Sequence, residues 1–249
     1  MLSVEATQGS VPREKGAWMA VFAGDTVNTI GGGNLEYQAI AQARSRLSGA
    51  SGEAVVRYPL GPSLGQCCGG VVFVRFELVT AADIPALRAR LYERLQPVAL
   101  FGGGHVGVAL ARVLAMLPFS LTWIDSREGI FPDGLPPSIA CEHSDPVQAA
   151  VHDLAPGSRV LIMSFSHAED LDVVAACLKR QREKADLPYI GLIGSKTKWA
   201  TFRHRLEARG FGEDELAHIT CPIGVPGITG KEPEVIAVAV AAQLLQTTT

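Results

Sequence analysis

At positions 98–107 the chain reads Val98-Ala99-Leu100-Phe101-Gly102-Gly103-Gly104-His105-Val106-Gly107. Four apolar residues suited to a buried strand lead directly into three glycines, Gly102, Gly104 and Gly107, spaced as Gly-x-Gly-x-x-Gly, and residues 106–116 are predicted to continue as a helix. The order strand, glycine turn, helix is the context that a dinucleotide-binding turn requires. Gly102 permits the tight turn, Gly104 lets a phosphate approach the backbone, and Gly107 lets helix and strand pack closely. The helix N-terminus adds free N–H donors for an anion.

The next predicted strand, residues 121–124, ends in Asp125. An acidic residue about 20 positions beyond the glycines is the group that meets a ribose hydroxyl in dinucleotide sites. The alternative is a glycine turn that serves only close backbone packing. The combination of the glycine turn with Asp125 favours a phosphate- or nucleotide-binding site over that alternative.

The composition is typical of a folded protein with a sizeable core and little net charge. Of the 249 residues, 47% are apolar and 26 are glycine, and the formal net charge is -3. This length suits two domains of ordinary size. The charge balance gives no general attraction to nucleic acid or to an anionic membrane, so neither is expected as a partner.

Three features predict a cytoplasmic protein. The longest apolar segment, residues 235–245, is too short to span a bilayer, and the first residues lack the pattern of a signal peptide. The five cysteines form no Cys-x-x-Cys pair and no disulfide framework, which suits a reducing compartment.

Residues 1–96 are predicted to form an N-terminal mixed α/β domain. Gly31-Gly32-Gly33-Asn34 leads into a helix that Asn34 is expected to cap. This second glycine turn, which includes Gly32, is able to cradle an anion, and tight backbone packing is an equally supported alternative. The strands of this domain are expected over residues 2–6, 17–22, 27–30, 54–58 and 71–78.

Two adjacent cysteines, Cys67 and Cys68, stand in a glycine-rich loop of the same domain. Neighbouring side chains diverge and other ligands at metal-site spacing are missing, so a zinc site is not expected. A thiol on such a loop, with backbone N–H groups that lower its pKa, is suited to be a soft ligand or a sulfur-handling group. The alternative is one buried cysteine that packs as a small apolar residue beside an incidental neighbour.

Residues 97–249 alternate strands with helices, which predicts a Rossmann-like, doubly wound parallel sheet. A helix that begins after Thr80 and runs to about residue 95 precedes this domain, and Gln96-Pro97 ends the helix. Further helices are expected over residues 146–154, 171–184 and 199–209. The fold class is therefore α/β, with two domains.

Ligands of open parallel sheets bind over the carboxyl ends of the strands, and two polar loops are predicted there. His167 follows one strand and is suited to act as a general acid, a base or a ligand, although local hydrogen bonding explains it equally well. Lys196 follows another strand and a glycine, at a helix start, which makes an anion site. No assembled catalytic group and no metal-ligand cluster stands out, so no catalytic residue and no metal site is expected.

Six strings of the chain resemble the xanthine dehydrogenase accessory protein family, XdhC, in the right order over nearly the whole length. They are Gly9-Ser10-Val11-Pro12-Arg13, Ile30-Gly31-Gly32-Gly33-Asn34-Leu35-Glu36, Leu64-Gly65-Gln66-Cys67-Cys68-Gly69-Gly70, Phe101-Gly102-Gly103-Gly104-His105-Val106-Gly107, Ile190-Gly191-Leu192-Ile193-Gly194-Ser195-Lys196 and Cys221-Pro222-Ile223-Gly224. By this resemblance residues 1–96 are an XdhC/CoxI-like domain and residues 97–249 the Rossmann-like domain.

The resemblance implies a bacterial chaperone, a homodimer, rather than a turnover enzyme. Such a protein binds molybdenum cofactor (molybdopterin), holds it while a cysteine desulfurase supplies a sulfur ligand, and inserts it into the molybdenum subunit of xanthine dehydrogenase. Proteins of cofactor biosynthesis are further implied partners. The cofactor's phosphate is then expected at the three fingerprint glycines with help from Lys196, and Cys67 and Cys68 near the molybdenum or the path of sulfur.

A rival hypothesis is an NAD(P)-dependent oxidoreductase that uses the same glycines, with His167 as its acid or base. Against it, no Tyr-x-x-x-Lys pair or comparable hydride-transfer set is present. A third hypothesis is a partner-binding scaffold whose apolar C-terminal helix is an interface.

Overall fold

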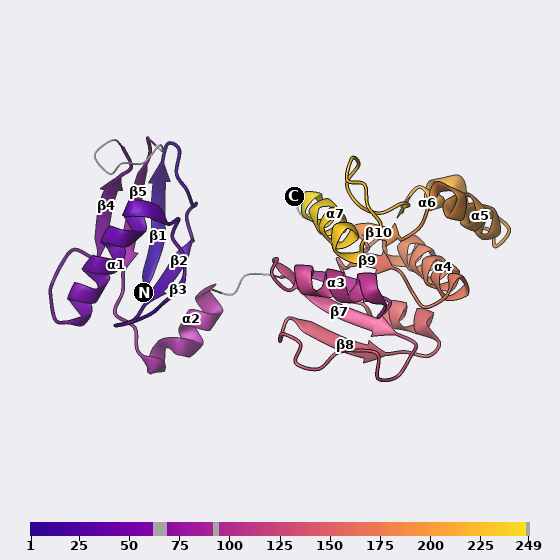
Figure 1. Ribbon diagram of the computed structural model, residues 1–249, viewed down its shortest axis with the longest axis horizontal. Coiled ribbons are helices and arrows are strands. Elements are labelled where there is room, and N and C mark those ends of the chain that lie inside the picture. Colours follow the sequence, from indigo (N-terminus) through magenta and orange to yellow (C-terminus); the bar gives the residue numbers. More distant parts are fainter. Residues whose placement is uncertain (62–68, 92–94, 248–249) are drawn as a thin grey trace. The chain divides into compact units, whose positions relative to one another are not determined.

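The computed structural model describes residues 1–61, 69–91 and 95–247 (Figure 1). The chain divides into two compact units, Met1–Tyr92 and Glu93–Thr249, each with its own sheet and its own core. Cys67 and Cys68 lie outside the described residues.

The first unit is one antiparallel sheet with a helix packed on it. Its strands lie in the order β3-β2-β1-β5-β4 and each neighbouring pair is antiparallel. Along β5, buried and half-buried side chains alternate because successive residues of a strand point to opposite faces. The buried face packs with Leu35, Ala39 and Ala43 of the helix α1. The elements are β1 (Leu2–Gln8), β2 (Trp18–Val21), β3 (Thr26–Asn28), α1 (Gly33–Leu47), β4 (Val55–Pro59), β5 (Val71–Phe76), the short 3-10 helix η2 (Ala81–Asp83) and α2 (Ile84–Leu91).

The start of α1 corrects one prediction, because the N-cap residue is Gly32 and not Asn34. Gly31, Gly32 and Gly33 have φ angles of 127°, 70° and 64°, in the region that glycine adopts at least cost. The chain therefore turns within the glycines, and the helix has already begun when it reaches Asn34.

The second unit is a six-stranded sheet in the order β11-β10-β9-β6-β7-β8, with every neighbouring pair parallel. The chain starts in the middle at β6, builds outward to β8, and then returns to the other side of β6 with β9. This doubly wound order has its switch point between β6 and β9, and it confirms the predicted Rossmann-like fold. The strands are β6 (Gln96–Phe101), β7 (Phe119–Asp125), β8 (Ile139–His143), β9 (Arg159–Ile162), β10 (Tyr189–Leu192) and β11 (Ile219–Thr220).

Helices cover both faces of this sheet, which explains why its central strands are continuously apolar. On β6, Val98 and Leu100 pack with α3 and α7 on one face, whereas Ala99 and Phe101 pack with α4, α5, α6 and η3 on the other. In Figure 1, α3 and α7 lie beside each other over the sheet. The helices are α3 (His105–Leu114), the 3-10 helix η3 (Val147–Asp153), α4 (His167–Lys184), α5 (Lys196–Glu207), α6 (Glu213–Leu216) and α7 (Pro233–Gln246).

Several predicted helices differ in extent or type from those observed, and α5 begins at Lys196 rather than at residue 199. The helix expected from Thr80 to about residue 95 begins as the short η2 and continues as α2 (Ile84–Leu91), and residues 92–94 lie outside the described part of the chain. The helix expected from residue 171 begins at His167, and the one expected over 146–154 is the 3-10 helix η3. In the described ranges no helix is long and apolar enough to cross a bilayer.

Candidate functional site

The glycine turn lies at the switch point, where β6 passes into α3. Gly102 has φ +120°, and a Cβ placed on it would lie 2.0 Å from the carbonyl oxygen of Met163 at the end of β9. A Cβ on Gly107 would lie 2.1 Å from the carbonyl oxygen of Gly102, which also accepts a hydrogen bond of 2.9 Å from Nε1 of Trp123. Both glycines are therefore required by the packing of the protein itself.

Gly104 differs from the other two fingerprint glycines. It is the exposed N-cap residue of α3, with φ -72° and ψ -177°, and a Cβ placed on it meets no atom within 4 Å. Neither its backbone conformation nor its surroundings require glycine. The space beside it lies at the N-terminus of a ten-residue helix, where backbone N–H groups and the helix dipole favour an anion.

Asp125, at the end of β7, is held by four hydrogen bonds from the protein. Its Oδ2 accepts from the Gly103 N–H at 2.6 Å and from Arg127 Nη2 at 2.9 Å. Its Oδ1 accepts from the backbone N–H and from Nε of Arg127, both at 2.9 Å. The carboxylate is 1% exposed and links the end of β7 to the glycine turn.

The pKa of Asp125 follows from these contacts. Burial alone would raise it, but the hydrogen bonds from Arg127 and Gly103 outweigh burial and hold the pKa below its ordinary value. The carboxylate is therefore ionised at neutral pH and forms an ion pair with Arg127. The guanidinium of Arg127 also lies over the ring of Phe165, with Cζ 4.5 Å from the centroid.

The loop after β9 carries His167 to the same edge of the sheet. Ser166 caps α4 by accepting the Glu169 N–H at 3.2 Å, so His167 is the first residue of the helix and is exposed. Its ring meets the ring of Phe202 edge-on, with centroids 6.3 Å apart. Glu169 in turn accepts hydrogen bonds from Ser126 Oγ at 2.8 Å and from the Phe165 N–H at 3.1 Å.

The lysine that is bonded to other residues at this edge is Lys198, whereas Lys196 was the lysine singled out from the sequence. Its Nζ donates to Asp170 Oδ2 at 2.6 Å and to the Ile193 carbonyl oxygen at 2.8 Å. Asp170, 2% exposed, also accepts the Ser164 N–H at 2.7 Å, so the pair joins the loops after β9 and β10. The predicted Lys196 is the exposed first residue of α5. Helical geometry is the signal that separates the two lysines, because residues two apart face different sides.

The second glycine turn belongs to the first unit, and its donors are used within the protein. The N–H groups of Gly32 and Ile30 donate to Glu36 Oε2 at 3.1 and 3.0 Å. A Cβ on Gly31 would lie 2.6 Å from Pro12 Cγ. These contacts support the packing interpretation of this turn.

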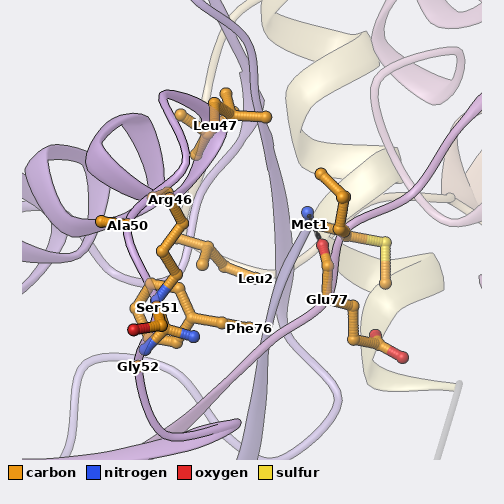
Figure 2. A pocket seen from close by; sticks show the side chains of 12 residues that line it. Met1, Leu2, Arg46, Leu47, Ala50, Ser51, Gly52, Phe76 and Glu77 are labelled. Carbon is orange, nitrogen blue, oxygen red and sulfur yellow. Dashed lines mark hydrogen bonds between the residues drawn. The ribbon is translucent and has the colours of Figure 1, made fainter.

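The first unit also contains a cavity of about 310 Å³, shown in Figure 2. Leu2 and Phe76 contribute apolar walls, and Arg46 lies across the Phe76 ring with Cζ 4.1 Å from its centroid. The described site residues do not line this cavity. Among the described residues no three His, Cys, Asp or Glu side chains are grouped to hold a metal ion.

Taken together, the parallel sheet and the glycine turn define the second unit as a doubly wound domain of the Rossmann class. Residues 98–244 match the family model of the XdhC Rossmann domain, and residues 1–59 match that of the XdhC and CoxI family. Because the first model alone spans more than half of the chain, the chain belongs to the XdhC family.

Two relatives are similar over almost the entire chain. The uncharacterized protein YqeB of Escherichia coli K12 is 28% identical over 99% of this chain, which spans only 43% of that relative's length. The crystal structure of a xanthine dehydrogenase from Bacillus halodurans is 21% identical, covers 99% of this chain and 90% of its own, and superposes with a TM-score of 0.78. That similarity shows a shared fold.

Proposed function

We propose that this chain binds molybdenum cofactor, holds it while a cysteine desulfurase adds a sulfur ligand, and inserts it into the molybdenum subunit of xanthine dehydrogenase. Membership of the XdhC family supports this role. In this proposal the chain is an accessory protein rather than a turnover enzyme. It acts in the cytoplasm as a homodimer and receives the cofactor from proteins that synthesise it.

The observation that carries the proposal is the open space at Gly104. A fingerprint glycine that no atom of the described residues confines leaves room for a ligand atom at the helix N-terminus. The cofactor carries a phosphate, which fits this position because its charge is opposite to that of the α3 N-terminus. Gly102 and Gly107 shape the turn, and the exposed side chain of Lys196 adds a cation at the same edge of the sheet.

The proposal assigns the other end of the cofactor to sulfur chemistry. Cys67 and Cys68 are proposed to lie near the molybdenum or the path of the incoming sulfur, because thiolates are soft ligands. His167 is proposed to contact the ligand, since it is exposed at the first turn of α4. Asp125 bonds within the second unit and is proposed to shape the glycine turn at Gly104. Gly32 bonds within the first unit and is proposed to shape the turn before α1.

Anaerobic binding of molybdenum cofactor to the purified chain tests the proposal, with wild type compared with Gly104→Asp. Aspartate is a good N-cap residue, so the variant folds normally while it places a negative charge where the phosphate is expected. The matched control is Gly24→Asp, a second glycine whose Cβ would meet nothing within 4 Å. Cofactor retention in wild type and Gly24→Asp, and its loss in Gly104→Asp, is the expected result.

Two outcomes contradict the proposal. Equal retention of the cofactor by Gly104→Asp and wild type would show that its phosphate does not bind at the glycine turn. Binding of NAD without retention of the cofactor would favour the NAD(P)-dependent oxidoreductase, which would use the same glycines.

A further inference from the structure

Asp125 has no acceptor position left for a ligand. A carboxylate offers about four lone-pair positions. Protein donors take two on each oxygen, from Gly103 and from the backbone and side chain of Arg127. In a dinucleotide site, the residue at this place binds ribose hydroxyls. Here Arg127 takes the hydrogen-bonding positions on the Asp125 carboxylate that those hydroxyls would need.

The flat face of the Arg127 guanidinium is held as well. Its guanidinium lies over Phe165, and the Phe165 N–H is bonded to Glu169, which accepts a second bond from Ser126 Oγ. A ribose would therefore have to displace two side-chain hydrogen bonds and an aromatic contact, and would leave a cation that had lost its partner. Such a planar, two-pronged Arg–carboxylate pair is among the stronger polar contacts in proteins.

The phosphate position does not depend on Asp125. It lies beside Gly104 at the start of α3, whereas Asp125 bonds to the Gly103 N–H. Arg127 Nη2 and the Gly103 N–H both donate to Asp125 Oδ2, so this one oxygen atom bridges the guanidinium and the glycine turn. The turn can therefore accept a phosphate while the ribose position stays filled.

We infer that Arg127 is a specificity-determining residue, which makes the glycine turn accept a phosphate monoester without a nucleoside and reject NAD. This inference rests on the proposed function only in placing a phosphate at Gly104. In this inference Asp125 holds Arg127 in place and does not bind ribose.

Isothermal titration of the full chain with two probes tests the inference. NAD carries the ribose, and phenyl phosphate is a phosphate monoester without one. The variants are Arg127→Ala, which frees the Asp125 oxygens, and Arg127→Lys, which keeps a cation but cannot make the two-pronged contact. The matched control is Arg182→Ala, because Arg182 makes the same two-pronged contact with Glu215 and lies over Phe211, at 5.3 Å, away from the turn.

The expected result is that wild type binds phenyl phosphate at least tenfold more tightly than NAD. Both Arg127 variants should gain at least tenfold in affinity for NAD, and Arg182→Ala should match wild type. The inference is overturned if wild type binds NAD as tightly as phenyl phosphate, or if both Arg127 variants that fold, as judged by circular dichroism, bind NAD no better than wild type. Binding of phenyl phosphate by wild type and a gain for NAD in the Arg127 variants, together with no binding of molybdenum cofactor, would overturn the proposed function and leave this inference standing.

Discussion

The three glycines of the Gly-x-Gly-x-x-Gly turn are glycine for different physical reasons. Gly102 and Gly107 are confined by carbonyl oxygens about 2 Å from any added Cβ, 2.0 and 2.1 Å respectively. Gly104 is confined by nothing in the described protein. Stability measurements can therefore separate the two glycines that the packing of the turn requires from the one that is proposed to leave space for a ligand.

Replacing Gly107 with alanine should destabilise the second unit by about 1 to 3 kcal/mol, because a backbone oxygen cannot move without moving α3. Replacing Gly104 with alanine should cost less than about 1 kcal/mol, since it loses only a favourable N-cap residue. Urea unfolding followed by circular dichroism measures both values. Equal losses in the two variants would contradict the geometry of the turn.

Acid should weaken the second unit through Asp125. Its pKa is lower folded than unfolded, so the ionised carboxylate contributes stability above its ordinary pKa of about 3.9. That contribution disappears as the pH falls through the folded pKa. Asp125→Asn should therefore be less stable than wild type at pH 7, and the difference in unfolding free energy should shrink below about pH 4. A difference that stays constant down to pH 2.5 would exclude this role.

At the scale of elements, a buried arginine joins α4 to η3. Arg180, 5% exposed, donates to the carbonyl oxygens of Val151 and Leu154 and pairs with Asp186. Arg180→Met should cost about 3 to 5 kcal/mol, because it leaves a carboxylate and buried carbonyl groups without their donor. Arg203, whose side chain is 42% exposed and pairs with Glu207 and Glu213, is the control, and Arg203→Met should cost less than about 1 kcal/mol in the same urea titration. Similar costs for the two variants would show that α4 does not depend on this contact.

The sequence predicts best those elements whose signals are local and strong. The strand, glycine turn and helix around β6 and α3 are confirmed, because apolar runs and glycine spacing act over a few residues. The start of α1 is predicted wrongly, because Asn34 is a good cap in isolation but the glycine φ angles end the turn before it. The two-residue β11 and the four-residue α6 were not predicted, since so few residues carry no periodicity.

Side-chain partners in the site were predicted less well than its place in the fold. The carboxyl ends of the strands follow from the doubly wound topology, so the glycine turn, Asp125 and His167 could all be assigned to that edge. Which lysine turns inward depends on packing between two loops that are far apart in sequence, because Lys198 pairs with Asp170. The partner of Asp125 is local, since Arg127 is only two residues away. The short spacing Asp125-x-Arg127 is the one local signal that could have indicated the ion pair.

At the scale of the whole molecule, the two hydrophobic cores of the second unit consist only of residues from that unit, from Val98 to Leu244. A fragment of residues 95–249 should therefore fold alone and unfold in one cooperative transition. Differential scanning calorimetry of the fragment and of the full chain should show that transition within a few degrees in both. A fragment without a cooperative transition would show that its stability depends on residues 1–94.

The packing of the glycine turn also bears on how copies of this gene diverge. A descendant that lost its ligand would still need Gly102 and Gly107, because each is hemmed in by backbone of the same domain. It would be free to replace Gly104, whose side-chain space is empty. Conservation of Gly102 and Gly107 would thus indicate only that the domain folds, whereas conservation of Gly104 would support the proposed binding site.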